Sequence, residues 1–269
     1  ENMTKLTFIE QVKAFRAKTN APLGRCSQVL KAAGGDEEKA LKLLRLEEEK
    51  SAGKKGERET NEGLVKAFVS EDKKKVAVVE VLCETDPVAK NQFFLDFAEK
   101  VAKALLLAPG ASLDRDAFLA TRVDEEHTVE SARVALVGVM GENIQLGRFR
   151  ILETTGFWSF YCHGSRIAVP LALASDDDAL GKSIAMHIAA MAPEAIDEAH
   201  LPKDVREAAV ARFRQEALES GKPEAIVDKI AQGKVNKWIG EVTLCGQIFI
   251  KELEKPAGEQ KTVGQWLDA

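Results

Sequence analysis

Residues 76–91, VAVVEVLCETDPVAKN, join a predicted strand to a predicted helix through a short polar corner, residues 83–87. The first seven residues are almost all apolar and rich in valine, which is typical of a strand in the middle of a covered sheet. Apolar residues then recur at largely helical spacing over residues 88–105, so we expect an amphipathic helix that begins near Pro87. Asp86 suits the N-cap of this helix, and Pro87 suits its first position, where no backbone N–H is missed. The stretch therefore predicts a well-capped strand-to-helix turn.

Composition and charge indicate a globular chain that works with protein partners. At 269 residues, with 45% hydrophobic and 30% charged residues, the chain is long enough to bury a sizeable core. Its 38 lysines and arginines are interleaved with 43 aspartates and glutamates, for a net charge of −5, so the basic footprint of a direct nucleic-acid binder is missing. The longest apolar stretches are far shorter than the ~20 residues of a membrane helix, and we expect no membrane insertion. The four cysteines are dispersed, which favours a reducing compartment over a disulfide framework or a zinc site.

The first part of the chain predicts a small helical module. Two helical segments are followed by Gly34-Gly35-Asp36, which restarts a third helix. We therefore expect a compact three-helix module over residues 4–46. Residues 47–63 contain almost no large apolar side chain and include three glycines, which is typical of a mobile linker.

Beyond this linker the sequence predicts an α+β fold with two related subdomains. Two apolar segments that flank a turn, followed by a helix, occur twice along the chain. We assign residues 64–155 to a first subdomain and residues 156–202 with 240–269 to a second, each with a small antiparallel sheet. Residues 203–239 contain two helical stripes separated by Gly221-Lys222-Pro223, which predicts an inserted, coiled-coil-like helical hairpin. The predicted strands are residues 64–70, 76–83, 146–153, 158–162 and 166–174, and further helices are predicted at 129–139 and 179–191.

No motif for covalent chemistry has the spacing that such chemistry needs. Residues 180–183, LGKS, resemble the end of a phosphate-binding loop, but Asp176 replaces the first glycine of that loop, and a carboxylate there would repel phosphate. His187 lies on an apolar helix, where a core histidine is the better interpretation. No histidine has a nucleophile and an acidic partner at an interpretable spacing. We therefore expect no enzyme, no catalytic residue, no metal and no cofactor.

The corner and the motifs around it resemble the translation elongation factor Ts family. Residues 85–90, TDPVAK, are similar to the family signature Thr-Asp-Phe-Val-Ala-Lys, which also follows a strand. The similarity runs from about Leu6 to Leu267, and the module at residues 4–46 then corresponds to the UBA-like module of the family. Further motifs follow in the family order with the spacing kept: GENI at 141–144, YCHGSRI at 161–167, AMHIAA at 185–190, SGKP at 220–223, GEVTLCGQIF at 240–249 and TVGQ at 262–265.

This resemblance implies guanine-nucleotide exchange on the GTPase elongation factor Tu, by promoting GDP release without covalent chemistry. An exchange factor binds the nucleotide-free state of its partner better than the nucleotide-bound state. In the family the Asp-Phe corner enters the GTPase beside its magnesium and phosphate site, two further contacts come from the second half of the chain, and the helical module docks through residues around Leu23 to Gln28. The expected partner-binding residues are therefore Asp86, Pro87, Val88, Lys90, His163, Ile250, Arg25 and Cys26.

Three departures from the family pattern leave a second function open. Pro87 stands where the family has the aromatic residue that enters the GTPase, although a neighbour such as Phe93 can restore that contact. Arg25 replaces an acidic residue, and Ser27-Gln28 replace two lysines. The chain ends at Ala269, where the family continues into a further strand and helix. The alternative is a repurposed structural or assembly subunit of a large mitochondrial complex, a ribosome or a respiratory complex, with weakened or lost exchange activity.

The location of the protein follows from weaker signals. The first residue is Glu1 and not methionine, which fits either the removal of an import peptide or a sequence trimmed at its start. We expect the mitochondrial matrix, with the bacterial cytoplasm as the alternative.

Overall fold

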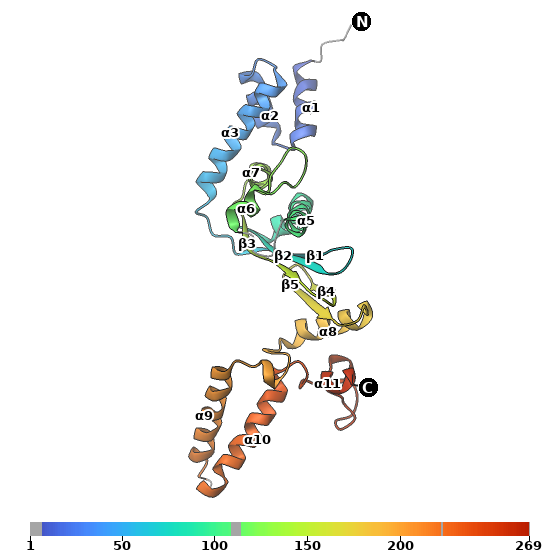
Figure 1. The fold of residues 1–269 in the computed structure, drawn as a ribbon. Coiled ribbons are helices and arrows are strands. Elements are labelled where there is room, and N and C mark those ends of the chain that lie inside the picture. Colours follow the sequence, from blue (N-terminus) through green and yellow to red (C-terminus); the bar gives the residue numbers. More distant parts are fainter. Residues whose placement is uncertain (1–6, 109–113, 222, 269) are drawn as a thin grey trace. The chain divides into compact units, whose positions relative to one another are not determined.

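The computed structural model describes residues 7–108, 114–221 and 223–268 (Figure 1). Residues 4–6 of the predicted module, residues 109–113, Lys222 and Ala269 lie outside the described residues. Contacts divide the chain into two compact units, Glu1–Asp176 and Asp177–Ala269. Helices and two antiparallel sheets make up the structure, so the predicted α+β class is confirmed.

The first unit opens with three helices, α1 (Phe8–Thr19), α2 (Leu23–Ala32) and α3 (Glu37–Lys55), drawn in blue in Figure 1. A capping box between Thr7 and Glu10 starts α1, and the side chain of Asp36 caps α3. The three helices enclose a small apolar core of their own. Its buried residues are Val12, Phe15, Ala21, Cys26, Val29, Leu30, Ala33, Ala40 and Leu44.

The third helix runs nine residues beyond its predicted end at Leu46, into the segment that the sequence indicated as a mobile linker. Leu44, Glu48 and Ala52 recur every fourth residue and are all buried, so one face of this polar segment is packed. Small and charged residues hid this face from a search for large apolar side chains. The expectation of a linker is wrong for residues 47–55, and the next strand begins at Glu62.

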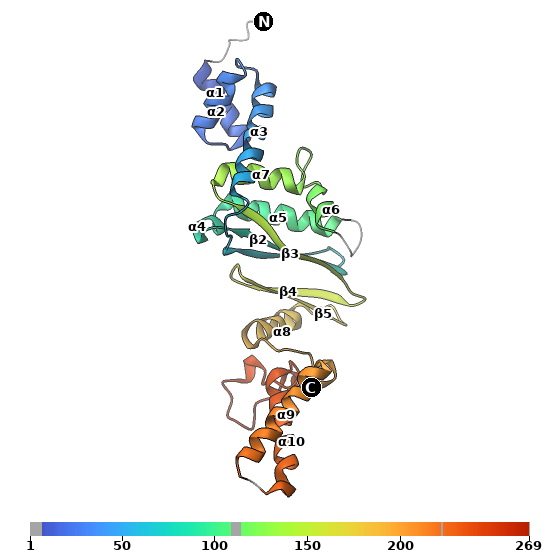
Figure 2. The same ribbon diagram turned by 90° about the vertical axis from the view of Figure 1, so that its left-hand side faces the viewer.

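The central sheet has the order β1-β2-β3, formed by β1 (Glu62–Val69), β2 (Lys75–Cys83) and β3 (Ile144–Glu153). Both neighbours pair with β2 in antiparallel register, and β2 is the middle strand, as its valine-rich sequence predicted. Helices α5 (Gln92–Leu107), α6 (Arg115–Ala120) and α7 (Val129–Met140) lie on one side of this sheet (Figure 2). The main core of the unit lies between the sheet and these helices.

The helix after the corner is divided in two, contrary to the single helix that the sequence predicted. A four-residue helix, α4 (Asp86–Ala89), is followed by Lys90 and then by α5, which has its own N-cap at Asn91. The side chain of Asn91 accepts the N–H of Phe93 at 2.9 Å, so it starts a new helix where the old one would have continued. The N-cap residue of α4 is Thr85 and not Asp86, which was predicted for that position.

A separate two-stranded sheet pairs β4 (Phe157–His163) with β5 (Ile167–Leu173). The turn between them is joined to the central sheet, because Val65 donates its N–H to the carbonyl of Ser165 at 2.7 Å. By contacts this hairpin belongs to the first unit, whereas the sequence assigned it to the second subdomain. The division into the predicted domains stays a prediction.

The second unit consists of helical elements. Helix α8 (Asp178–Met191) is followed by the short 3-10 helix η1 (Glu198–His200), and α9 (Lys203–Glu219) and α10 (Glu224–Val242) form an antiparallel pair. Ala217, Val227 and Val235 are buried, which accounts for the apolar stripes in the sequence. The unit ends with η2 (Ile250–Glu252) and α11 (Val263–Leu267). Within the described part of the chain, no helix is both long and apolar enough to cross a membrane.

Glu48 is a carboxylate in the packed contact between α3 and α7. Its side chain is 5% exposed, and a Cβ atom added at Gly138 of α7 would come within 2.8 Å of its Cγ. Gly138 therefore leaves the room that Glu48 occupies. Burial raises the pKa of Glu48 from 4.5 to about 7, against the opposing charges of Arg25 and Arg45. The fold thus favours the protonated form of this carboxyl group.

Replacing Glu48 with glutamine should stabilise the protein at alkaline pH. Glu48 has a higher pKa in the folded state than in the unfolded state, so its protonated form contributes to the free energy of unfolding. This contribution is fully present below pH 4.5 and is lost as the pH rises from 4.5 to about 7. Glu48→Gln removes this loss, so we expect a higher free energy of unfolding at pH 8, by up to about 3 kcal/mol, and no gain near pH 4.5. Urea unfolding at both pH values measures the difference, with Glu49→Gln at the exposed neighbouring position as the control. Equal stability of Glu48→Gln and wild type at pH 8 would contradict this account.

Candidate functional site

The corner presents a short polar surface at the end of the central strand. Cys83 closes β2 and is fully buried, whereas Thr85, Asp86 and Pro87 are exposed. Asp86 Oδ2 lies 2.7 Å from the Nζ of Lys90, one turn further along. Val88 is half-buried and packs against the main core, and Ala89, also in α4, is buried. Three of the four residues predicted here, Asp86, Pro87 and Lys90, therefore reach solvent, and Val88 anchors them.

The corner is held by the turn between α7 and β3. The N–H of Thr85 donates to Glu142 Oε2 at 3.0 Å, and its hydroxyl donates to Glu142 Oε1 at 2.6 Å. Glu84 Oε1 accepts the backbone N–H of Asn143 at 2.5 Å. The partners in these hydrogen bonds are more than fifty residues apart in sequence, and no local sequence pattern predicts these contacts.

Phe93 presents an exposed aromatic ring in the first turn of α5. The side chain is 45% exposed, whereas its neighbour Phe94 is fully buried. The ring lines a cleft of about 900 Å³ between the helical module and the helices that cover the sheet, with Lys18 and Lys100 among the other lining residues.

The predicted contact residues of the helical module are less exposed than their neighbours. Cys26 is fully buried in the core of the module, and its thiol donates to the carbonyl of Ala21 at 3.4 Å. Arg25 is half-buried and lies near the Glu48 carboxylate, and its Nη1 has no hydrogen-bond partner among the described residues. Leu23, which starts α2, is 50% exposed. The surface of this helix is thus formed by Leu23 and its polar neighbours, and the buried Cys26 supports it from inside.

His163 ends strand β4 and is exposed. It lies opposite Ile167 in the two-stranded sheet, and its Nδ1 is 3.0 Å from the hydroxyl of Tyr161 on the same face. The imidazole ring is therefore oriented by a neighbour while it remains open to solvent.

Ile250, in the second unit, is placed by a buried histidine. It is half-buried at the start of η2, and its N–H donates to Nδ1 of His187 at 3.2 Å. An accepting Nδ1 leaves the proton on Nε2, which is 3.0 Å from Oε1 of Gln247. Burial lowers the pKa of His187, so the neutral form is favoured. His187 is the core histidine that the sequence indicated, and it fixes the backbone at Ile250.

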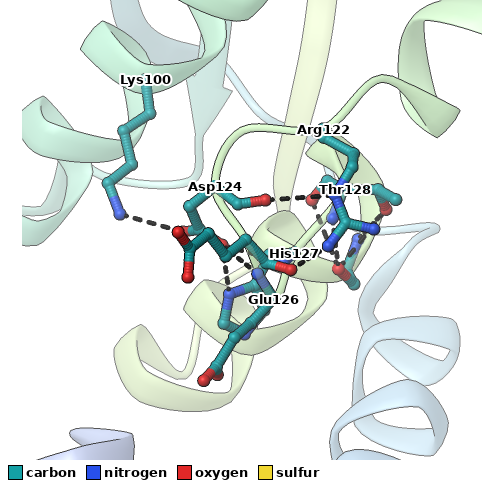
Figure 3. Close-up of polar contacts among 8 residues, drawn as sticks. Lys100, Arg122, Asp124, Glu126, His127 and Thr128 are labelled. Carbon is teal, nitrogen blue, oxygen red and sulfur yellow. Dashed lines mark hydrogen bonds and ion pairs between the residues drawn. The ribbon is translucent and has the colours of Figure 1, made fainter.

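A second polar cluster, in the loop between α6 and α7, is explained by the loop itself (Figure 3). Asp124 Oδ1 accepts the N–H groups of Glu126 and His127 at 3.0 and 2.8 Å, and Oδ2 accepts from Nζ of Lys100 at 3.2 Å. Although burial raises the pKa of Asp124, these hydrogen bonds lower it well below its usual range. The carboxylate closes the loop. Across the described ranges, no group of three or more histidine, cysteine, aspartate or glutamate side chains is arranged to hold a metal ion.

Comparison with known proteins identifies the family. The family model described as Elongation factor TS matches residues 84–269. The chain is 40% identical over 250 residues to elongation factor Ts of Thioalkalivibrio sulfidiphilus, covering 92% of this chain and 84% of that protein. It is 42% identical over 242 residues to elongation factor Ts of Azoarcus sp. strain BH72, with 90% and 80% covered, and 41% identical over 258 residues to that of Burkholderia cenocepacia, with 96% and 84% covered. This chain therefore belongs to the elongation factor Ts family.

Proposed function

We propose that the protein is a guanine-nucleotide exchange factor that promotes GDP release from elongation factor Tu. The observation that carries this proposal is the exposed corner: Asp86 and Pro87 project from the end of β2 at the position of the family signature, on a chain that belongs to that family. Exchange requires only that the chain bind the nucleotide-free GTPase more tightly than the nucleotide-bound form. This task needs a binding surface and no catalytic group. A rigid corner with an exposed charged residue provides such a surface.

Phe93 supports this proposal by supplying the aromatic surface that Pro87 lacks. An aromatic anchor at the centre of an interface contributes about 2 kcal/mol or more, which corresponds to tens-fold in affinity. The Phe93 ring is 45% exposed, and Phe93 follows Asp86 by seven residues and Pro87 by six along the chain. We infer that Phe93 is a contact residue beside Asp86, Pro87 and Lys90.

The remaining predicted contacts extend this interface. Leu23 offers an exposed apolar side chain on the helical module, with Arg25 and Cys26 beneath the same surface. His163 offers an exposed imidazole on the two-stranded sheet, and Ile250 a backbone position fixed by His187. Leu23, Arg25, His163 and Ile250 are proposed as contacts to the GTPase, and the buried Cys26 supports the module surface from inside.

The comparisons with known proteins do not support the alternative of a repurposed subunit in a mitochondrial assembly. The relatives reported above all carry the name elongation factor Ts, and all come from bacteria. Their source also favours a bacterial cytoplasm over the mitochondrial matrix as the location of this protein.

The Pro87→Phe variant tests the proposed mechanism directly. We expect wild type at micromolar concentration to accelerate release of fluorescent GDP from elongation factor Tu, and Pro87→Phe to accelerate it further, up to tens-fold at sub-saturating concentration. The helix should tolerate the change, because proline in the first turn acts mainly by presetting the backbone. Pro256→Phe, at an exposed proline in a distant turn, is the matched control. Folded wild type and folded Pro87→Phe that both leave GDP release at its uncatalysed rate would refute the exchange function.

The Phe93→Ala variant tests whether Phe93 contacts the GTPase. Loss of an interface aromatic should raise the half-saturating concentration of the exchange factor about tenfold or more, with little effect on folding, because the ring is 45% exposed. Leu107→Ala, at the 83% exposed end of the same helix, provides the control for a general effect of removing surface apolar area. Identical titration curves for Phe93→Ala and wild type would show that the ring lies outside the interface.

A further inference from the structure

The carboxylate of Glu142 is bound to the corner through both of its oxygens. Oε2 accepts the backbone N–H of Thr85 and Oε1 accepts the hydroxyl of the same residue, at 3.0 and 2.6 Å. Glu142 follows Gly141, which ends α7 in the left-handed conformation with φ of 78°. That conformation favours glycine, and it turns the chain so that the next residue faces the corner.

Thr85 is in the N-cap position of α4 but does not act as a cap. A threonine at this position ordinarily accepts an N–H of the first helical turn with its hydroxyl oxygen. Here α4 has no side-chain cap hydrogen bond, and the Thr85 hydroxyl is directed to Glu142 instead. The corner is therefore oriented by a distant turn and not by its own helix.

The turn that carries Glu142 is itself fixed at two points. Asn143, which is 1% exposed, donates its backbone N–H to Glu84 Oε1 at 2.5 Å and its side-chain amide to the carbonyl of Arg58 at 2.7 Å. Nη1 of Arg58 also lies 3.4 Å from Glu84 Oε1. The strand end, the turn after α7 and the segment after α3 thus form one connected hydrogen-bond network. This network holds the backbone next to Glu142 in place.

We propose that Glu142 is a positioning residue for nucleotide exchange, which holds Thr85 so that Asp86 and Pro87 are presented to the GTPase in the binding geometry. This inference rests on the proposed function. Glu142 acts through Thr85 and needs no contact with the nucleotide. When a binding-competent conformation is populated only in part, the apparent affinity falls by that fraction, whereas the properties of the bound complex are retained.

Variants at both ends of the contact test this role. Glu142→Ala should raise the half-saturating concentration for GDP release about tenfold and leave the maximal rate within twofold of wild type. Glu142→Gln should recover most of the loss, because its amide oxygen accepts the N–H of Thr85 and its NH2 group donates to the hydroxyl. Thr85→Val should weaken exchange in the same way, and the double variant Thr85→Val with Glu142→Ala should be no worse than the more affected single variant. Glu71→Ala, at an exposed carboxylate in the β1–β2 turn, is the control.

Hydrogen exchange of α4 separates this inference from the proposed function. The amides of Ala89 and Lys90 donate to the carbonyls of Thr85 and Asp86, each at 3.2 Å, and should exchange faster in Glu142→Ala, while β2 amides remain as in wild type. If wild type does not accelerate GDP release from elongation factor Tu, but α4 loses protection in Glu142→Ala, the exchange function is overturned. The role of Glu142 in positioning the corner then remains intact. Unchanged α4 protection, or a Glu142→Ala titration that matches that of an active wild type, would overturn the positioning role. If Glu142→Ala does not fold, the same two criteria apply to Thr85→Val.

Discussion

The burial of β2 between β1 and β3 is the constraint on which the first unit depends. Val76, Val79, Val81 and Cys83 are all fully buried, and both edges of this strand are occupied by antiparallel neighbours. A strand held on both edges and covered by helices leaves the sheet at one defined place. The corner therefore starts at a fixed position at the end of β2. This position also constrains where the exposed residues after it lie.

The proposed site combines exposure with rigidity. Asp86 and Pro87 must reach a partner, so they cannot be held by their own burial. Their support comes from buried Ala89 on one side and from the carboxylates of Glu84 and Glu142 on the other. A partner-binding loop that is ordered before binding loses less conformational entropy on association. The second unit uses the same device at Ile250, whose backbone N–H is held by the buried ring of His187.

Sequence periodicity predicted the regular elements well, and local chemistry explains where it failed. Strands β1 to β5 and helices α7 and α8 lie close to their predicted bounds, because apolar spacing is a direct record of which face is buried. The break between α4 and α5 was missed because the apolar stripe continues across it, while Asn91 starts a new helix. The extension of α3 was missed because Glu48 and Ala52 do not look like core residues until α7 is placed against them.

The sequence by itself determined the fold class, the central strand, the family resemblance and the corner as a candidate site, since each depends on residues that are near one another in the chain. Only the tertiary structure showed that Phe93 is exposed at the start of α5 and that Glu142 holds Thr85. The reason is physical. A local pattern records which way a side chain faces, but a hydrogen bond between residues 57 positions apart exists only after the strand and the turn have packed against the same core.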